Sequence, residues 1–152
     1  MALFGLQPDF NNALLSDYFC GKNVSTEPKE IYIGLGLEQQ GAQVNTEDFT
    51  EVFAGRPLGN YSRERVIFGK AVDGAITNLN DVIFSTASED WSTPNAKISM
   101  IGIFDTIDYE KADTKELIKP LVVFALPSEV TALRGETIIL RAGTITLAFT
   151  NN

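Results

Sequence analysis

The stretch Ile31–Leu37, IYIGLGL, decides the class of fold. From Ile31 onward every second residue is a large aliphatic, whereas Tyr32, Gly34 and Gly36 occupy the alternate positions. A period of two is typical of a half-buried β-strand, because successive side chains point to opposite faces of a sheet. Two glycines in a strand further predict a bend or the close approach of another part of the chain.

Similar strand signals follow at short intervals and are separated by turn residues such as Asp73-Gly74, Pro94-Asn95, Pro127 and Arg134-Gly135. No helical pattern lies between them, which favours antiparallel pairing over βαβ units. We therefore predict a mainly β chain with a jelly-roll-like antiparallel β-sandwich. The expected strand regions are 60–72, 75–88, 97–105, 118–126, 130–143 and 144–150.

The N-terminal region has a different pattern. Apolar residues recur at helical spacing after Asp9, which can cap a helix, and Gly21 can end it, so we predict a short helix at about residues 10–20. Residues 38–60 are polar and rich in turn formers, which predicts a long loop with one helical turn near 47–52. No linker or shift in composition divides the chain, so residues 1–152 are predicted to form a single domain.

Composition excludes several classes of function. A net charge of −8 repels phosphate backbones and anionic lipid, so neither nucleic acid nor membrane is expected as a partner. No apolar run reaches the roughly 20 residues that span a bilayer, and no charged n-region marks an export signal. Cys20 is the single cysteine and histidine is absent, which removes Cys-based zinc sites and His-dependent catalysis. We predict no enzyme activity, catalytic residue, metal or cofactor.

Interface residues are expected near the middle of the chain. Tyr61, Arg63 and Arg65 alternate and so share one face of a strand, and an aromatic side chain beside arginines is favoured at protein interfaces. Phe49 and Phe53 add apolar side chains in the preceding loop. The alternative is that Tyr61 packs on the rim of the core and Arg63 hydrogen-bonds a loop.

Structural roles are predicted for Asp90, Trp91 and Phe104. A tryptophan buries a large area, so Trp91 is expected to plug a corner of the sheet, with Asp90 capping the turn that follows and Phe104 in a core strand. The alternative is a carbohydrate-binding module in which Tyr32, Tyr61 or Trp91 stacks on a sugar.

An acidic segment, DTIDYEKADTKE, begins at Asp105 and ends at Glu116. Its carboxylates could supply oxygen ligands to calcium, but the spacing does not match an EF-hand and two lysines are interleaved. A solvated hairpin loop is the favoured interpretation. A carboxylate pair acting as a glycosidase needs a separation that sequence spacing cannot show.

A series of short motifs follows the length of the chain in a fixed order. They are Asn12–Gly21, Pro28–Leu35, Glu51-Val52, Tyr61-Ser62-Arg63, Asn78 or Asn80 through Ala87 to Asp90-Trp91, Gly102–Asp105, Gly135–Ile138 and Ala142–Leu147. This ordered series resembles a family of small tailed-bacteriophage virion proteins described as tail-fibre-like, head-fibre or minor structural proteins. The chain departs from the family pattern at three places. Ser92 replaces the glycine after the tryptophan, and two loops, 54–60 and 108–120, are longer in this chain.

The resemblance implies a structural β-sandwich in a virion, without a catalytic set. The single cysteine and the lack of an export signal predict synthesis in the host cytoplasm. We predict a capsid decoration or cement protein on the phage head, with a tail- or neck-associated fibre or adaptor protein and a host-glycan-binding module as alternatives. The expected partners are further copies of the chain, in a homo-oligomer such as a trimer, and other virion proteins such as the major capsid protein. Edge strands and the 38–60 loop would supply the contacts.

Overall fold

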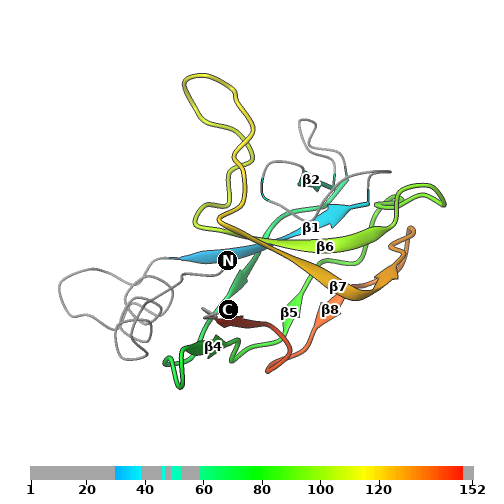
Figure 1. The fold of residues 1–152 in the computed structure, drawn as a ribbon. Helices are drawn as coiled ribbons and strands as arrows, with labels where there is room; N and C mark the ends of the chain where they lie inside the picture. The colour runs from blue at the N-terminus through cyan, green and yellow to red at the C-terminus, as the bar shows by residue number, and fades with distance from the viewer. Residues whose placement is uncertain (1–29, 39–45, 47–48, 53–58, 149–152) are drawn as a thin grey trace. The chain divides into compact units, whose positions relative to one another are not determined.

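Strands are the only regular secondary structure among residues 30–38, 46, 49–52 and 59–148, which are those that the computed structural model describes (Figure 1). The prediction of a mainly β chain with antiparallel pairing is confirmed. The predicted helix at 10–20 lies outside the described residues. No helix in this described part is long and apolar enough to cross a membrane. The strands are β1 (Ile31–Leu37), β2 (Thr50–Glu51), β3 (Glu64–Val66), β4 (Ala75–Thr77), β5 (Val82–Ile83), β6 (Ile98–Phe104), β7 (Val122–Val130), β8 (Ile139–Leu140) and β9 (Thr146–Ala148).

The chain divides into two compact units, each built from separate segments. The described part of unit 1 comprises residues 30–31, 65–82 and 140–148, and that of unit 2 comprises 32–38, 46, 49–52, 59–64 and 83–139. The chain leaves and re-enters each unit, so neither is a contiguous stretch of sequence. The single-domain organisation stays a prediction.

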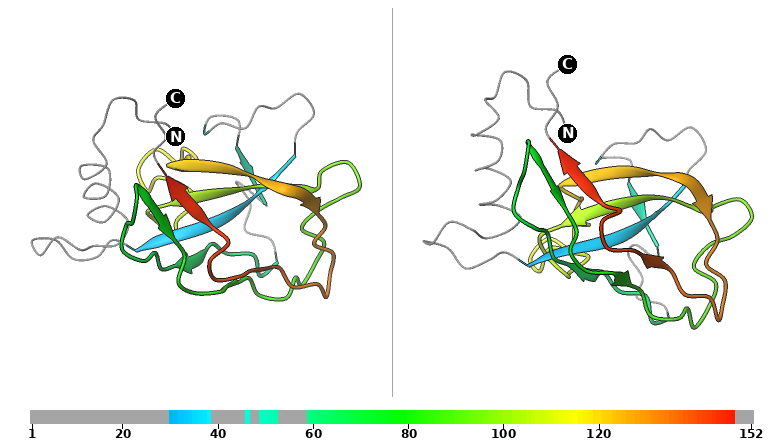
Figure 2. Two further views of the ribbon diagram at one scale, coloured as in Figure 1. Left: turned by 60° about the horizontal axis from the view of Figure 1, so that its bottom comes forward. Right: turned by 90° about the horizontal axis from the view of Figure 1, so that it is seen from below.

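Most of the main sheet, in which the strand order is β2-β1-β6-β7, lies in unit 2. Strands β1, β6 and β7 run side by side in both views of Figure 2. The two central strands are opposed with Gly34 facing Gly102 and Leu35 facing Ile101. Residues 33–36 of β1 are all buried, so both faces of this strand are covered, and not one face as the period of two predicts.

Unit 1 is organised around the pairing of β4 with β9. The turn before β4 is formed by Asp73 and Gly74, whose positive φ angles of 52° and 77° are typical of a tight hairpin turn. Buried Asn78 follows β4 and connects it to the approach to β9, since its Oδ1 accepts from Ile145 N at 2.8 Å and its Nδ2 donates to Arg141 O at 3.0 Å. A single amide side chain thus links the end of β4 to main-chain groups of the segment before β9.

Two local predictions are corrected. Thr50 and Glu51 form strand β2, and not part of a helical turn, because they pair with Leu37 and Gly36 of β1. Pro127 lies inside β7 and not at a break between strands. A proline is tolerated there because β7 ends the sheet order and its register shifts between the Ile98 and Met100 pairings.

The glycines of β1 and β6 make room for bulky side chains on one face of the sheet. A Cβ on Gly34 would lie 2.5 Å from Glu51 Oε1 and 2.8 Å from Phe104 Cε2, and a Cβ on Gly36 would overlap the Phe49 ring. The prediction of close approach at these glycines is therefore confirmed. The glycine-lined face carries a small core cluster of Phe49, Met100 and Phe104.

Replacing Gly34 with alanine is expected to lower the free energy of unfolding by about 1–3 kcal/mol, because the added methyl group displaces a buried carboxylate. Gly69→Ala is the control, since its Cβ would come closest to the end of the flexible Leu79 side chain, at 3.0 Å, and would lie at ordinary contact distance from Thr77 O, at 3.7 Å. Urea unfolding followed by circular dichroism measures both. Equal stability of Gly34→Ala and wild type would contradict the close approach.

Candidate functional site

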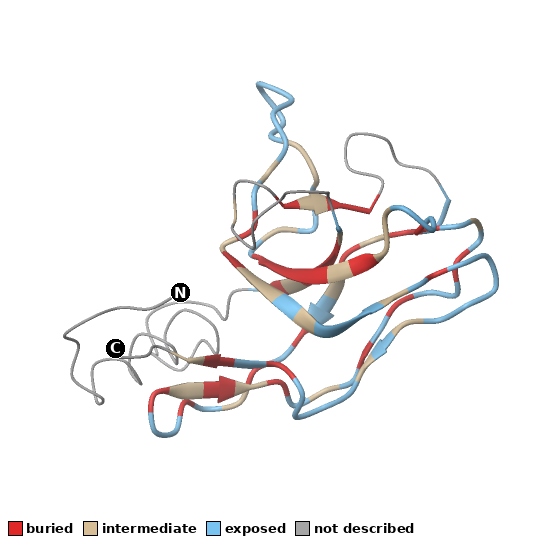
Figure 3. Cartoon of the chain, turned by 45° about the vertical axis from the view of Figure 1, so that its right-hand side comes forward, coloured by how far each residue is buried: buried red, intermediate tan, exposed pale blue. Residues whose placement is uncertain are grey.

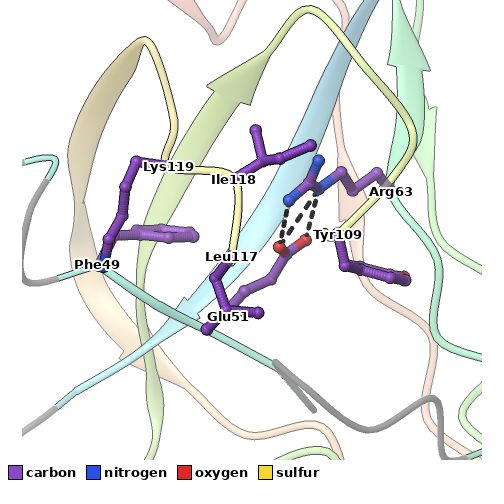
Figure 4. Close-up of a pocket in the computed structure, with 7 residues that line it drawn as sticks. All are labelled: Phe49, Glu51, Arg63, Tyr109, Leu117, Ile118 and Lys119. Atoms are coloured by element: carbon purple, nitrogen blue, oxygen red, sulfur yellow. Dashed lines mark hydrogen bonds and ion pairs between the residues drawn. The ribbon is translucent and has the colours of Figure 1, made fainter. Parts of the chain in front are cut away.

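A buried ion pair in unit 2 joins Arg63 to Glu51 (Figure 4). Arg63 is 2% exposed and Glu51 5%. The guanidinium binds the carboxylate in a fork, with Nη2 at 2.8 Å from Oε2 and Nε at 3.0 Å from Oε1. Such paired, charge-assisted hydrogen bonds are what make a buried charge tolerable, since either group alone would be left desolvated.

Aromatic rings enclose this pair. The guanidinium carbon of Arg63 lies 3.5 Å from the ring centroid of Phe104 and 5.1 Å from that of Tyr109. The hydroxyl of Tyr61 donates to Glu51 Oε1 at 2.8 Å and accepts from Leu35 N at 2.9 Å. The planar cation is therefore stacked on its faces and hydrogen-bonded at its edge, an environment that fixes its orientation.

The same arginine holds the base of the hairpin loop that joins β6 to β7. Both hydrogen bonds of its Nη1 go to main-chain carbonyls, those of Thr106 and Asp108. The hydroxyl of Tyr109 donates to the carbonyl of Tyr61 at 3.2 Å, which adds a second attachment. The loop, residues 105–121, is thus fixed at its base while it extends away from the sheet (Figure 1).

The outer part of this hairpin is exposed (Figure 3). Glu110 and Leu117 form a bridge across it, and the Lys111 and Glu116 side chains form an exposed ion pair at 3.5 Å. The interpretation of residues 105–116 as a solvated hairpin loop agrees with this geometry. Within the described part of the chain, no three acidic, cysteine or histidine side chains come together as metal ligands would.

A cavity of about 20 Å³ lies beside the ion pair. It is lined by Phe49, Glu51, Arg63, Tyr109, Leu117, Ile118 and Lys119 (Figure 4). That volume holds roughly one water molecule. The cavity is therefore too small for a sugar or a nucleotide. The ion pair beside it is suited to positioning a loop.

Ionisation of the tyrosines in this network is shifted to high pH. Burial, with the Glu51 carboxylate adding to it, raises the pKa of Tyr61 well above its usual value. The same two causes raise the pKa of Tyr109 to about 12. In both cases the low-dielectric interior and the nearby negative charge disfavour a phenolate.

A tyrosine whose pKa is higher in the folded than in the unfolded state stabilises the fold fully below the unfolded value, about 10. That stability is lost as the pH rises from about 10 through the folded pKa of Tyr109, about 12. We therefore expect the free energy of unfolding to fall steeply above pH 10. Urea unfolding at a series of alkaline pH values measures this. The free energy of unfolding should fall less steeply with pH in Tyr109→Phe than in the wild type. An identical slope in that variant would contradict the assignment.

The structure separates the residues predicted as interface candidates. Tyr61 and Arg63 lie inside unit 2, which corrects their placement on an exposed strand face and agrees with the alternative that Arg63 hydrogen-bonds a loop. Arg65 is exposed, and its side chain forms a long ion pair with Glu30, at 3.9 Å. Phe49 is buried on the glycine-lined face, and Phe53 lies outside the described residues.

The structure places Trp91 in the interior of unit 2, at 2% exposure. Its ring packs edge to face with Tyr61, with centroids 5.3 Å apart, and its indole N–H finds no hydrogen-bond acceptor among the described residues. Asp90 accepts from Arg134 N at 2.8 Å, so it caps a turn 44 residues further along and not the one after the tryptophan. Neither Trp91 nor Tyr61 can stack on a sugar from these positions.

Sequence reasoning did not identify Glu51 as the partner of Arg63. Both residues lie in motifs that carry the family resemblance, Glu51-Val52 and Tyr61-Ser62-Arg63. Their presence in these motifs was the one feature of the sequence that could have indicated a shared role. Pairing across 12 residues depends on the close approach of two chain segments, and no local pattern encodes it.

Comparison with known proteins adds the evolutionary context. No curated protein matches this sequence. One family model, described as podophage GP4 fiber I protein gp80, matches residues 9–148 and so covers nearly the whole chain. The match includes β1, the Glu51–Arg63 pair, the hairpin and the final strand. The chain belongs to this family of podophage fibre proteins.

Proposed function

We propose that the protein is a non-enzymatic structural component of a podophage fibre that is incorporated into the virion and acts through protein–protein contacts. The observation that carries the proposal is the family match over residues 9–148. It favours the fibre alternative over a decoration or cement protein on the head. A jelly-roll-like β-sandwich, which the antiparallel ladders support, is a suitable rigid module for this role.

The buried ion pair suits this role because it is built to position and not to react. Arg63 is engaged by a carboxylate and two carbonyls and is enclosed by aromatic rings. Arg63 holds the base of the hairpin between β6 and β7, whose outer part is exposed. Ile107 and Leu117 on this hairpin are 48% and 43% exposed, which gives it apolar contact groups among the charges. We propose that the hairpin contacts another virion protein, such as the major capsid protein or a further fibre component.

Purified particles test the location. Mass spectrometry should detect the chain in particles at a stoichiometry reproducible between preparations, and antibody labelling should place it on fibres in electron micrographs. A non-structural protein of the same phage, absent from washed particles, is the control for contamination. Uniform labelling over the head surface would favour head decoration, and absence from particles would refute a virion role.

Glycan binding is not favoured for the described residues. Of the three aromatic side chains considered as sugar platforms, Trp91 and Tyr61 are buried and Tyr32 is partly buried. Tyr32 also packs against the Phe49, Met100 and Phe104 cluster.

A further inference from the structure

Strand β7 has one edge that pairs with no strand among the residues that the structure describes. It ends the order β2-β1-β6-β7, in which its neighbour is β6. Its first five residues, Val122–Leu126, read VVFAL and carry no charge. An uncharged edge rich in β-branched and aromatic residues is a template for pairing with another strand.

The direction of the main-chain groups on β7 follows from Leu35 in β1. Leu35 N donates to the Tyr61 hydroxyl and Leu35 O accepts from Val52 N, each at 2.9 Å, so both groups point away from β6. Directly opposed residues in an antiparallel ladder either bond each other or both point away. The N–H and C=O groups of Ile101, opposite Leu35, therefore point toward β7. Those of Phe124, opposite Ile101, point back toward β6.

Directions alternate along a strand, so Val123 and Ala125 direct their N–H and C=O groups to the free edge. No hydrogen bond from a described residue reaches these outward groups. Two outward residues with one inward residue between them are what a second antiparallel strand needs to form a ladder.

We propose that this edge binds β7 of a second copy of the chain, antiparallel and about a two-fold axis at Phe124. Val123 of each copy then faces Ala125 of the other and exchanges main-chain hydrogen bonds with it, while the two Phe124 side chains meet across the axis as an aromatic cross-strand pair. Two sheets of unit 2 thereby join into one continuous sheet.

The charges around the strand favour a second copy in this orientation. Lys119 precedes Phe124 by five residues and Glu129 follows it by five. Antiparallel pairing about Phe124 brings the lysine end of one copy to the glutamate end of the other, whereas parallel pairing would bring like charges together. Two chains of net charge −8 repel each other. Association is therefore favoured at a surface that carries no charge itself and has opposite charges at its two ends. Pro127 has no N–H to donate and limits the ladder to the first half of β7.

The inference rests on the proposed function for its biological role, since self-association matters in a protein that builds a fibre. Its test is separate, because it uses the purified protein alone. Sedimentation velocity over about 1 µM to 1 mM should show a reversible monomer–dimer equilibrium. Ala125→Pro should weaken the dimer about tenfold or more, because each dimer loses two main-chain hydrogen bonds. Ala125→Thr keeps the N–H and should dimerise like wild type, and circular dichroism should show that both variants are folded.

Cross-linking tests the register in a Cys20→Ser background. Opposed residues in a non-hydrogen-bonded pair have Cα atoms about 4.5 Å apart, which a disulfide can bridge, so Phe124→Cys should yield a covalent dimer on oxidation. Leu126→Cys is the matched control, because its two copies would be four residues out of register, about 13 Å apart, and should stay uncrosslinked. A monomer at every concentration, a trimer, a dimer indifferent to Ala125→Pro, or equal cross-linking of both cysteine variants would each overturn the proposal. None of these results would alter where the protein is found in particles.

Discussion

Arg63→Ala is expected to lower the free energy of unfolding by about 3–5 kcal/mol, the cost of leaving one partner of a buried ion pair unpaired. Glu51, which is 5% exposed in the wild-type structure, would lose its cation, and the carbonyls of Thr106 and Asp108 would lose their donor. Urea unfolding followed by circular dichroism gives the loss, and hydrogen exchange should show faster exchange of amides in the hairpin.

Arg65→Ala is the matched control for this experiment. It removes the same side chain two residues away, where the ion pair with Glu30 is exposed and 3.9 Å long, so the change should be within about 0.5 kcal/mol. In the double variant Glu51→Leu with Arg63→Met, removing both charges should recover part of the stability lost in the single variant. Equal effects of the two single arginine variants would contradict the role of Arg63 as an anchor.

Trp91→Ala should destabilise the fold by a similar amount, about 3–5 kcal/mol, because it empties a large volume in the interior of unit 2. Trp91→Phe should cost less. It keeps an aromatic ring against Tyr61, and it loses no hydrogen bond to a described residue, since the indole N–H has none there. Circular dichroism is the suitable probe, because both variants lack the fluorescent tryptophan.

Leu133→Ala is the control for the tryptophan series, since Leu133 is 41% exposed and its truncation should change stability by no more than about 0.5 kcal/mol. In the wild-type protein, Trp91 emission should be blue-shifted and unchanged by added sugars. Red-shifted emission that is quenched by a glycan would contradict the buried position.

The strands could be predicted where one local pattern specified them. The alternation in Ile31–Leu37 and the apolar run of β6 gave the two central strands of the main sheet, with bounds that agree to within a residue or two. Asp73-Gly74 gave a hairpin turn because its backbone conformation is a property of those two residues. The prediction of a strand break at Pro127 is wrong. A strand tolerates proline where no N–H donor is needed, which depends on which side of the strand is paired, and the sequence does not show this.

The site was harder to predict because its parts come together only through tertiary pairing. Tyr61, Arg63 and Arg65 have one spacing in the sequence, yet the first two are buried and the third is exposed. The difference arises from Glu51, whose approach over Gly34 places a carboxylate within reach of Arg63 and Tyr61. An arginine suited to an interface and an arginine suited to a buried pair carry the same chemical groups, so composition alone could not separate them.

The anchor of the hairpin has a consequence for how this chain can change. Arg63 holds main-chain carbonyls at positions 106 and 108, and the carbonyl group is common to every amino acid. The side chains of the outer segment, residues 111–116, are therefore free to be replaced, shortened or extended without loss of this attachment. The hairpin is therefore a suitable place to graft foreign peptides for display, because its attachment does not depend on the side chains that a graft would replace.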